Sequence, residues 1–417
     1  MNKFTRKLVA GAATTAMLFN TVLAPAFATT TIQITGNGAG SDNWSDVSQT
    51  TTTTVNQNNS ANVSTTVDAD ASTGGNDANF NTGGNVLIHT GDADVTAEVQ
   101  NILNSNSATV DCCVSGDTDV EISGNGAFSD NTVLLDQTAT TAVGQTNYAN
   151  VSNYVDADAK TGHNDALKNT GGDVTLVTGN AKVDVDVTTL ANVNSATVGG
   201  AQSASNPSAS FVIIGNGAGT DNYIGATLAK VTSLDQANYA SIVNDVDADA
   251  KTGGNDAGFN TGGDAVIATG NATVWADVNN AVNFNFADVD CGCTWDVLAK
   301  IAGNGADVDH EWWWDSTDNT ITLNLDSVQA MGQGNGAYLY NDLDDLDAKT
   351  GYNDLESNTA DVDGDPAVIT GNATVNSGVE NSGNVNTIGD FAPFQMPEMP
   401  HFDFSFNMSA LWAFFGM

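Results

Sequence analysis

Polar and apolar residues alternate with a period of two along much of the chain. In the segment NYANVSNYVDADA, one face carries Asn147, Ala149, Val151, Asn153 and Val155, and the residues between them form the other face. Strict alternation over thirteen residues is typical of a β-strand. The segment NAKVDVDV repeats the pattern, and no window has the spacing of an amphipathic helix. The pattern therefore predicts an all-β protein.

The same landmarks recur in the same order four times. The string GNGA begins at Gly36, Gly124, Gly215 and Gly303, with spacings of 88, 91 and 88 residues. An alternating stretch, an acidic cluster, an Asn-Thr segment and a second alternating stretch follow each time. The predicted organisation is a signal peptide in residues 1–28, repeat 1 in 29–116, repeat 2 in 117–207, repeat 3 in 208–296, a degenerate repeat 4 that is a candidate cap in 297–389, and a tail in 390–417.

Four such units predict a β-solenoid, a β-helix-like fold built of four repeats of about 90 residues. Thr-Gly recurs at Thr73, Thr82 and Thr90, which suggests short strands and roughly four coils per repeat. The inward-facing residues are small, and Asn recurs at inward or turn positions such as Asn192 and Asn194, where stacked amides can satisfy one another. The alternative architecture is a string of β-sandwich domains.

The N-terminus has the features of a secretory signal peptide. Lys3, Arg6 and Lys7 precede an apolar stretch, and small residues at Ala26 and Ala28 predict cleavage after Ala28. The chain is therefore expected to be secreted and to be extracellular or associated with the cell surface. The remaining 389 residues hold 7 lysines, no arginine and 50 acids, a formal charge of −43 (7 minus 50). Such a charge excludes nucleic acid as a partner, because it repels phosphates.

Each repeat contains an acidic cluster of the form DADAKTGGND. Two aspartates two residues apart share a strand face, and the following glycines allow a tight turn that can bring an Asn-Asp pair back towards them. Carboxylate and amide oxygens are calcium ligands, so Ca²⁺ is the candidate cofactor. The candidate ligands are Asp68, Asp70, Asn76 and Asp77; Asp156, Asp158, Asn164 and Asp165; Asp247, Asp249, Asn255 and Asp256; and Asp345, Asp347, Asn353 and Asp354.

A second interpretation of the cluster needs no metal. Asn-Asp pairs are common in turns, and a surface strand often carries acids. Lys160, Lys251 and Lys349 occupy one position of the cluster and can neutralise the carboxylates. Both interpretations remain open at the level of the sequence.

The segment TGGNDANFNTGG resembles the Gly-rich, Asp-bearing nonapeptides of the RTX β-roll, in which turns between short strands hold calcium. The segment QTNYANV is similar to the stacked coils of curlin-type subunits, where Gln, Asn and Ala recur on one strand face. The overall layout resembles repetitive, Asn/Thr/Gly-rich secreted surface proteins of bacteria. These resemblances imply a calcium-stabilised or self-associating surface protein.

Three further features stand outside the regular pattern. Cys112 and Cys113 of repeat 1 and Cys291 and Cys293 of repeat 3 occupy one repeat position and are disulfide candidates. With four coils per repeat, the two pairs would lie about eight coils or roughly 38 Å apart, which predicts local or intermolecular bonds. Trp312, Trp313 and Trp314 form a candidate binding patch for a surface polysaccharide or a cap, and the tail of residues 390–417 is a candidate docking or capping segment, rich in Phe, Met and Pro.

No catalytic constellation stands out, and we expect no enzyme activity. The four histidines lie at different repeat positions, and identical clusters in four repeats indicate a scaffold. The expected function is a non-catalytic structural or cell-surface protein, a stiff rod or filament-forming subunit stabilised by Ca²⁺ or by its own lysines. The expected partners are a second copy or the cell envelope. The alternatives are an adhesin or carbohydrate-binding module and, more remotely, a calcium-dependent polysaccharide-active β-helix enzyme.

Overall fold

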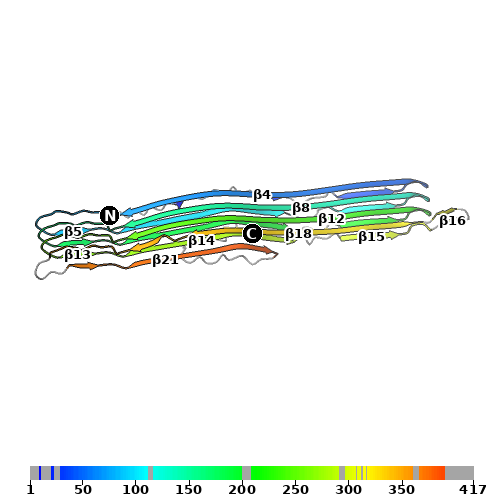
Figure 1. Cartoon of the computed structure of the whole chain (residues 1–417). Helices are drawn as coiled ribbons and strands as arrows, with labels where there is room; N and C mark the ends of the chain where they lie inside the picture. The colour runs from blue at the N-terminus through cyan, green and yellow to red at the C-terminus, as the bar shows by residue number, and fades with distance from the viewer. Residues whose placement is uncertain are drawn as a thin grey trace.

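The computed structural model describes residues 9–10, 20–22, 29–110, 116–199, 208–290, 296–306, 308–310, 313–315, 317–359 and 366–389. These residues form a long, thin β-solenoid made of stacked parallel strands (Figure 1). The all-β prediction and the solenoid are confirmed. The β-sandwich alternative is wrong, because strands of different repeats pair with one another throughout. None of the described residues forms a helix of the length and apolarity needed to cross a membrane.

One layer of the solenoid is a sheet of very long strands. Its order is β18-β12-β8-β4, and β19 extends the fourth rung beside β12. A strand of 31 residues spans about 100 Å at roughly 3.3 Å per residue. The strands are β4 (Asp42–Ser72), β8 (Asp130–Lys160), β12 (Asp221–Lys251), β18 (Asn319–Asp342) and β19 (Leu346–Lys349).

Three shorter parallel sheets complete each coil; the first packs against residues of the bend, and the second and third pack against the long sheet. The first contains β5 (Val86–His89), β9 (Val174–Val177), β13 (Ala265–Ala268) and β20 (Ala367–Ile369). The second contains β6 (Ala93–Val110), β10 (Ala181–Gly199), β14 (Ala272–Asp290) and β21 (Ala373–Ile388). The third contains β3 (Thr30–Thr35), β7 (Thr118–Ser123), β11 (Ser208–Ile214) and β15 (Asp296–Ala302).

Each repeat is one coil of this solenoid. The first coil runs through β3, β4, β5 and β6, and the next begins with β7, which pairs with β3. The prediction of roughly four coils per repeat is wrong. The Thr-Gly positions at Thr73, Thr82 and Thr90 lie at bends of a single coil, where the chain turns from the long layer into the opposite one. The spacing of 88 residues is therefore the length of one coil.

The core lies between the two layers and consists mainly of Val, Ile, Leu and Ala. Within β8 the predicted inward face is confirmed, since Asn147, Ala149, Val151, Asn153 and Val155 are all buried. The tyrosines of the other face are exposed. Period-two alternation thus produces one buried face, which is stacked on the equivalent face of the next coil.

The alternation is interrupted at one position of the second short sheet. Asn104, Asn192, Asn283 and Asn384 have positive φ values between 56° and 63°. Asn tolerates this conformation better than most residues. The pairing of β10 with β14 passes over Asn192, so the inward and outward faces exchange there.

Two departures from the stack lie at its ends. The fourth repeat carries an antiparallel hairpin of β16 (Val308–His310) and β17 (Trp313–Asp315), where the other repeats have a short turn. At the other end, β1 (Val9–Ala10) and β2 (Asn20–Val22) lie within the predicted signal peptide and pair in parallel with β6. We call the outer edge of β3, β4, β5 and β6 the first-coil end, and the outer edge of β15, β18, β20 and β21 the last-coil end.

Candidate functional site

The acidic clusters of successive repeats lie directly above one another. In the long sheet, Asp156 pairs with Asp68 on one side and Asp247 on the other. Asp158 lies in the same way between Asp70 and Asp249, and Asp249 pairs in turn with Asp347. Paired residues of neighbouring strands are separated by one strand spacing, about 4.8 Å. The carboxylates therefore form columns of like charge along the solenoid axis.

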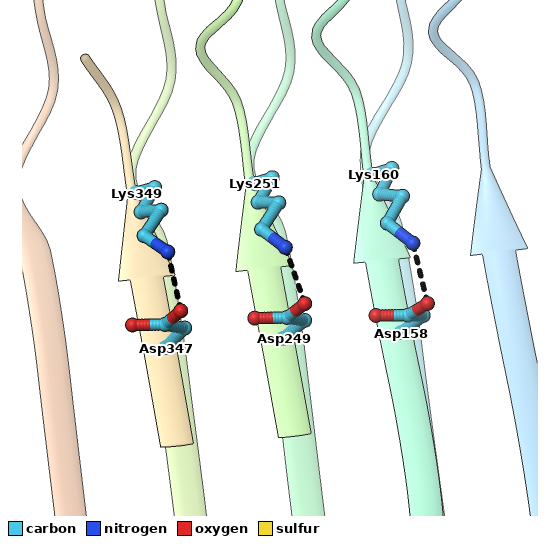
Figure 2. Close-up of polar contacts among 6 residues, drawn as sticks. All are labelled: Asp158, Lys160, Asp249, Lys251, Asp347 and Lys349. Atoms are coloured by element: carbon cyan, nitrogen blue, oxygen red, sulfur yellow. Dashed lines mark hydrogen bonds and ion pairs between the residues drawn. The ribbon is translucent and has the colours of Figure 1, made fainter. Parts of the chain in front are cut away.

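A lysine of the same repeat pairs with the second aspartate in three of the four coils. The Nζ atoms of Lys160, Lys251 and Lys349 donate to carboxylates two residues earlier, those of Asp158, Asp249 and Asp347 (Figure 2). The interpretation in which the lysine balances the cluster thus has a direct structural counterpart. The first repeat differs, because Ser72 occupies the position of the lysine.

The asparagines of the two middle clusters, Asn164 and Asn255, lie in the interior, whereas Asn76 of the first coil is exposed and Asn353 of the last coil is half-buried. Asn255 is 1 % exposed, and its Nδ2 donates to Thr252 O at 3.0 Å and to Asn353 Oδ1 at 2.8 Å. Its Oδ1 accepts hydrogen bonds from the Nδ2 and the backbone N–H of Asn164. That oxygen therefore already accepts from two donors of the neighbouring coil.

The last aspartate of the cluster also forms a column. Asp165 lies between Asp77 and Asp256, and Asp256 is bridged to Asp354. Within the described part of the chain, no group of three or more His, Cys, Asp or Glu side chains is arranged to hold a metal ion. Calcium binding by the predicted carboxylates and amides stays a prediction of the sequence.

Four carboxylates in the middle coils of these columns have raised pKa values. Partial burial raises the pKa of Asp156 and of Asp247, and the neighbouring carboxylates add to this rise. The pKa values of Asp165 and Asp256 are raised for the same two reasons, burial being the larger. One oxygen of Asp256, Oδ1, is shielded from solvent and has no hydrogen-bond partner among the described residues.

We expect acidification from pH 7 to about pH 4 to stabilise the fold. A pKa that is higher in the folded state means that folding takes up protons. This contribution is complete below the unfolded value of 3.8 and is lost as the pH rises through the folded pKa. Thermal melting between these pH values measures it. The double variant Asp156→Asn/Asp247→Asn should melt higher than wild type at pH 7 and respond less to pH, and a wild-type midpoint that falls on acidification would refute the explanation.

Ladders of asparagine side chains run through the interior, and most have one polarity. Asn76 Nδ2 donates to Asn164 Oδ1 at 2.9 Å, and the same contact is repeated from Asn164 to Asn255 and from Asn255 to Asn353. The predicted stacking of inward asparagines is confirmed. Ladders of the same polarity begin at Asn37, Asn104 and Asn106 and end at Asn304, Asn384 and Asn386.

The ends of these ladders are complementary. No described residue donates to the Oδ1 of Asn37 or Asn76 at the first-coil end. At the last-coil end, Asn353 uses one Nδ2 hydrogen for Thr350 O, and its second hydrogen has no acceptor among the described residues. Elsewhere in the column such a hydrogen always meets the Oδ1 of the next coil.

A glutamine ladder runs in the opposite direction. Gln145, Gln236 and Gln333 each donate from Nε2 to Oε1 of the preceding member, at 2.7 Å in every case, and the series starts at Gln57. Gln333 Oε1 is therefore the terminal acceptor. It is shielded from solvent and has no hydrogen-bond partner among the described residues. A shielded acceptor without a donor costs about 1–3 kcal/mol.

Glycines at the bends allow the coils to approach closely. A Cβ atom on Gly74, Gly162 or Gly253 would lie 1.8–1.9 Å from the carbonyl oxygen of the equivalent glycine in the next coil. Gly351 is the last member of this column, and a Cβ atom there would meet nothing within 4 Å. The close contact that excludes a side chain is thus present at every step except at the last-coil end.

The last-coil end also exposes apolar side chains whose equivalents are buried. Val375 and Val379 are 44 % and 49 % exposed, whereas Val274 and Val278 of the preceding coil are fully buried. At the first-coil end, Val99 is 1 % exposed, and β1 pairs at that position. Among the described residues, nothing pairs with the outer edges of β15, β18, β20 and β21.

The remaining predicted site residues are not described in full. Cys112, Cys113, Cys291 and Cys293, Trp312 and the tail of residues 390–417 lie outside the described residues, and only the backbone is described for Trp313 and Trp314. One related expectation is wrong. The strands that lead to the two cysteine pairs, β6 and β14, are separated only by β10, about 9.6 Å and not roughly 38 Å.

The glutamine ladder and the glycine column were not among the residues singled out from the sequence. Their signal is present there, because Gln57, Gln145, Gln236 and Gln333 follow the coil spacing. Comparisons of the chain with protein-family models, with curated proteins and with solved structures found no match.

Proposed function

We propose that this protein is a non-catalytic structural subunit that is exported and assembles end to end into a filament outside the cell. The observation that carries the proposal is the polarity of the asparagine ladders. Among the described residues, they begin with an acceptor that lacks a donor at the first-coil end and finish with a donor that lacks an acceptor at the last-coil end.

Stacking the first-coil end of one copy on the last-coil end of another would continue the asparagine ladders. Asn353 would donate to Asn76 of the next copy with the geometry that Asn255 adopts towards Asn353. Two last-coil ends facing each other would instead bring donors to donors. The ladders therefore favour head-to-tail addition over symmetric pairing.

The backbone and the apolar side chains favour the same arrangement. An open edge of parallel strands offers unpaired N–H and C=O groups to another strand. Exposed side chains such as Val375, Val379 and Met331 would be buried by a further coil, as Val274, Val278 and Leu234 are in the third coil. Burial of apolar surface is the main favourable contribution to association.

The proposal applies to the chain without residues 1–28. In the full chain, β1 and β2 occupy part of the β6 edge, which β21 of another copy would need. Removal of a signal peptide would free this edge after export. Under this proposal the subunits assemble at the site of secretion, because the edge becomes free there.

Electron microscopy of purified residues 29–417 tests the proposal. We expect polymers that lengthen with protein concentration, and few or none for the full chain with residues 1–28 retained. Isolated rods at every concentration would contradict the proposal and would favour the alternative of an adhesin. For an adhesin, the hairpin of β16 and β17 provides a projection that, among the described residues, only the fourth repeat has.

A further inference from the structure

The column of lysine–aspartate pairs is incomplete at one end of the solenoid. Coils two, three and four each hold their own pair, formed by Lys160, Lys251 and Lys349. In the first coil, Asp70 pairs in register with Asp158, but Ser72 stands where the lysine would be. The first-coil end therefore presents a carboxylate without a lysine of its own repeat.

The lysines act on more than their own repeat. The hydrogen bond to Asp158 raises the pKa of Lys160, and the carboxylates of Asp249 and Asp70, one coil away on either side, raise it further. For Lys349 the hydrogen bond to Asp347 again comes first, and the carboxylate of Asp249 in the preceding coil raises the pKa further. Lys349 thus has a neighbour on one side only.

We propose that Lys349 neutralises Asp70 of the next copy and thereby helps to select head-to-tail addition. This inference rests on the proposed end-to-end assembly. In a stack that keeps the register of the solenoid, Lys349 has the same position relative to Asp70 of the next copy as Lys160 has relative to Asp249 of the next coil. Without this lysine, Asp347 and Asp70 would meet one strand spacing apart with one cation fewer between them.

The same charges disfavour other modes of association. A contact between two first-coil ends contains no Lys349, so Asp70 of each copy would stay without a lysine. A contact between two last-coil ends contains no Asp70 for Lys349 to neutralise. Only the head-to-tail contact sets the lysine of one end against the uncompensated carboxylate of the other, so the pair adds specificity to the ladders.

The chain offers a matched control for the test. Lys251 makes the same bridge within its repeat, with 25 % of its side chain exposed against 40 % for Lys349, but it lies inside the stack. The concentration above which polymer forms is measured by sedimentation for residues 29–417 as wild type, Lys349→Gln and Lys251→Gln, with thermal melting as a check of folding. We expect Lys349→Gln to raise this concentration about two- to fivefold, less so in high salt, and Lys251→Gln to leave it nearly unchanged.

A rescue variant separates the charge from a general effect of the substitution. Ser72→Lys gives the first repeat the lysine of the other three, and it should return the Lys349→Gln variant towards the wild-type concentration. If Lys349→Gln and Lys251→Gln raised the concentration for polymer formation equally, or if Ser72→Lys gave no rescue, this inference would be overturned. The proposed assembly would still stand as long as the wild-type protein formed polymers. Failure of wild type itself to polymerise would remove both.

Discussion

Gly351→Ala is expected to abolish end-to-end assembly and to leave the folded monomer intact. In the monomer the new Cβ atom meets nothing within 4 Å, and Gly351 does not have a positive φ. When two copies stack, the carbonyl oxygen of Gly74 from the next copy lies beside Gly351, as Gly351 O lies beside Gly253 within one molecule. A Cβ atom on Gly253 would lie 1.8 Å from Gly351 O, so a Cβ atom on Gly351 would meet Gly74 O at a similar distance. A backbone atom cannot yield as a side chain can, so the two coils would be forced apart.

Sedimentation and circular dichroism of residues 29–417 check this prediction. We expect wild-type melting, with no polymer at concentrations at least tenfold above those sufficient for wild type. The control is Gly334→Ala in the same coil, where a Cβ atom is also unhindered and where the pairing strand already carries Ala237. Gly334→Ala should polymerise normally. Polymer formation by Gly351→Ala at the wild-type concentration would show that the coils do not stack at this edge.

Gly253→Ala is expected to have the opposite consequence, a severe loss of fold stability. Its Cβ atom would lie 1.8 Å from Gly351 O and 2.8 Å from the Gly351 carbonyl carbon within the same molecule. Relief requires the third and fourth coils to separate locally, which breaks the hydrogen bond from Gly254 N to Gly351 O and the adjacent asparagine ladder. We expect the free energy of unfolding to fall by more than about 3 kcal/mol.

Thermal or denaturant unfolding of Gly253→Ala beside Gly351→Ala measures the difference. The two substitutions are chemically identical and occupy one position of the repeat, so they differ only in whether a further coil is present. Nearly equal stabilities would mean that the close approach of the coils at this bend is not maintained in solution.

The alternation of residues was sufficient to predict strands and their buried faces. Alternating small residues such as Ala149 and Val151 lie on the inward face, and inward asparagines such as Asn147 and Asn153 are satisfied by stacking on their equivalents. These properties are local or follow from the repeat itself, because identical side chains at equivalent positions must meet in a parallel stack.

The size of the coil was not predictable from the same pattern. A period of two says which residues share a face but not how far a strand continues. The Thr-Gly steps after Thr73 suggested short coils, whereas the chain makes one broad bend there and returns along the rod. The register of the stack, with Asp68 beside Asp156, shows that the GNGA spacing was the coil length.

The acidic cluster was interpreted only in part. The pairing of Lys251 with Asp249 was anticipated as one of two alternatives. The burial of Asn255 was not, since asparagine is as common in exposed turns as in stacked interior ladders. Its place follows from the close contact at Gly253, which depends on the neighbouring coil and leaves no local signal in the sequence.

Cryo-electron microscopy of the polymer formed by residues 29–417 tests the central claim most directly. Four strands per layer at about 4.8 Å each predict one subunit every ~19 Å along the filament axis, with the strands perpendicular to that axis and β4 of one copy beside β18 of the next. A subunit repeat near the ~100 Å length of the long strands, or protein that remains as separate rods, would contradict end-to-end stacking of the coils.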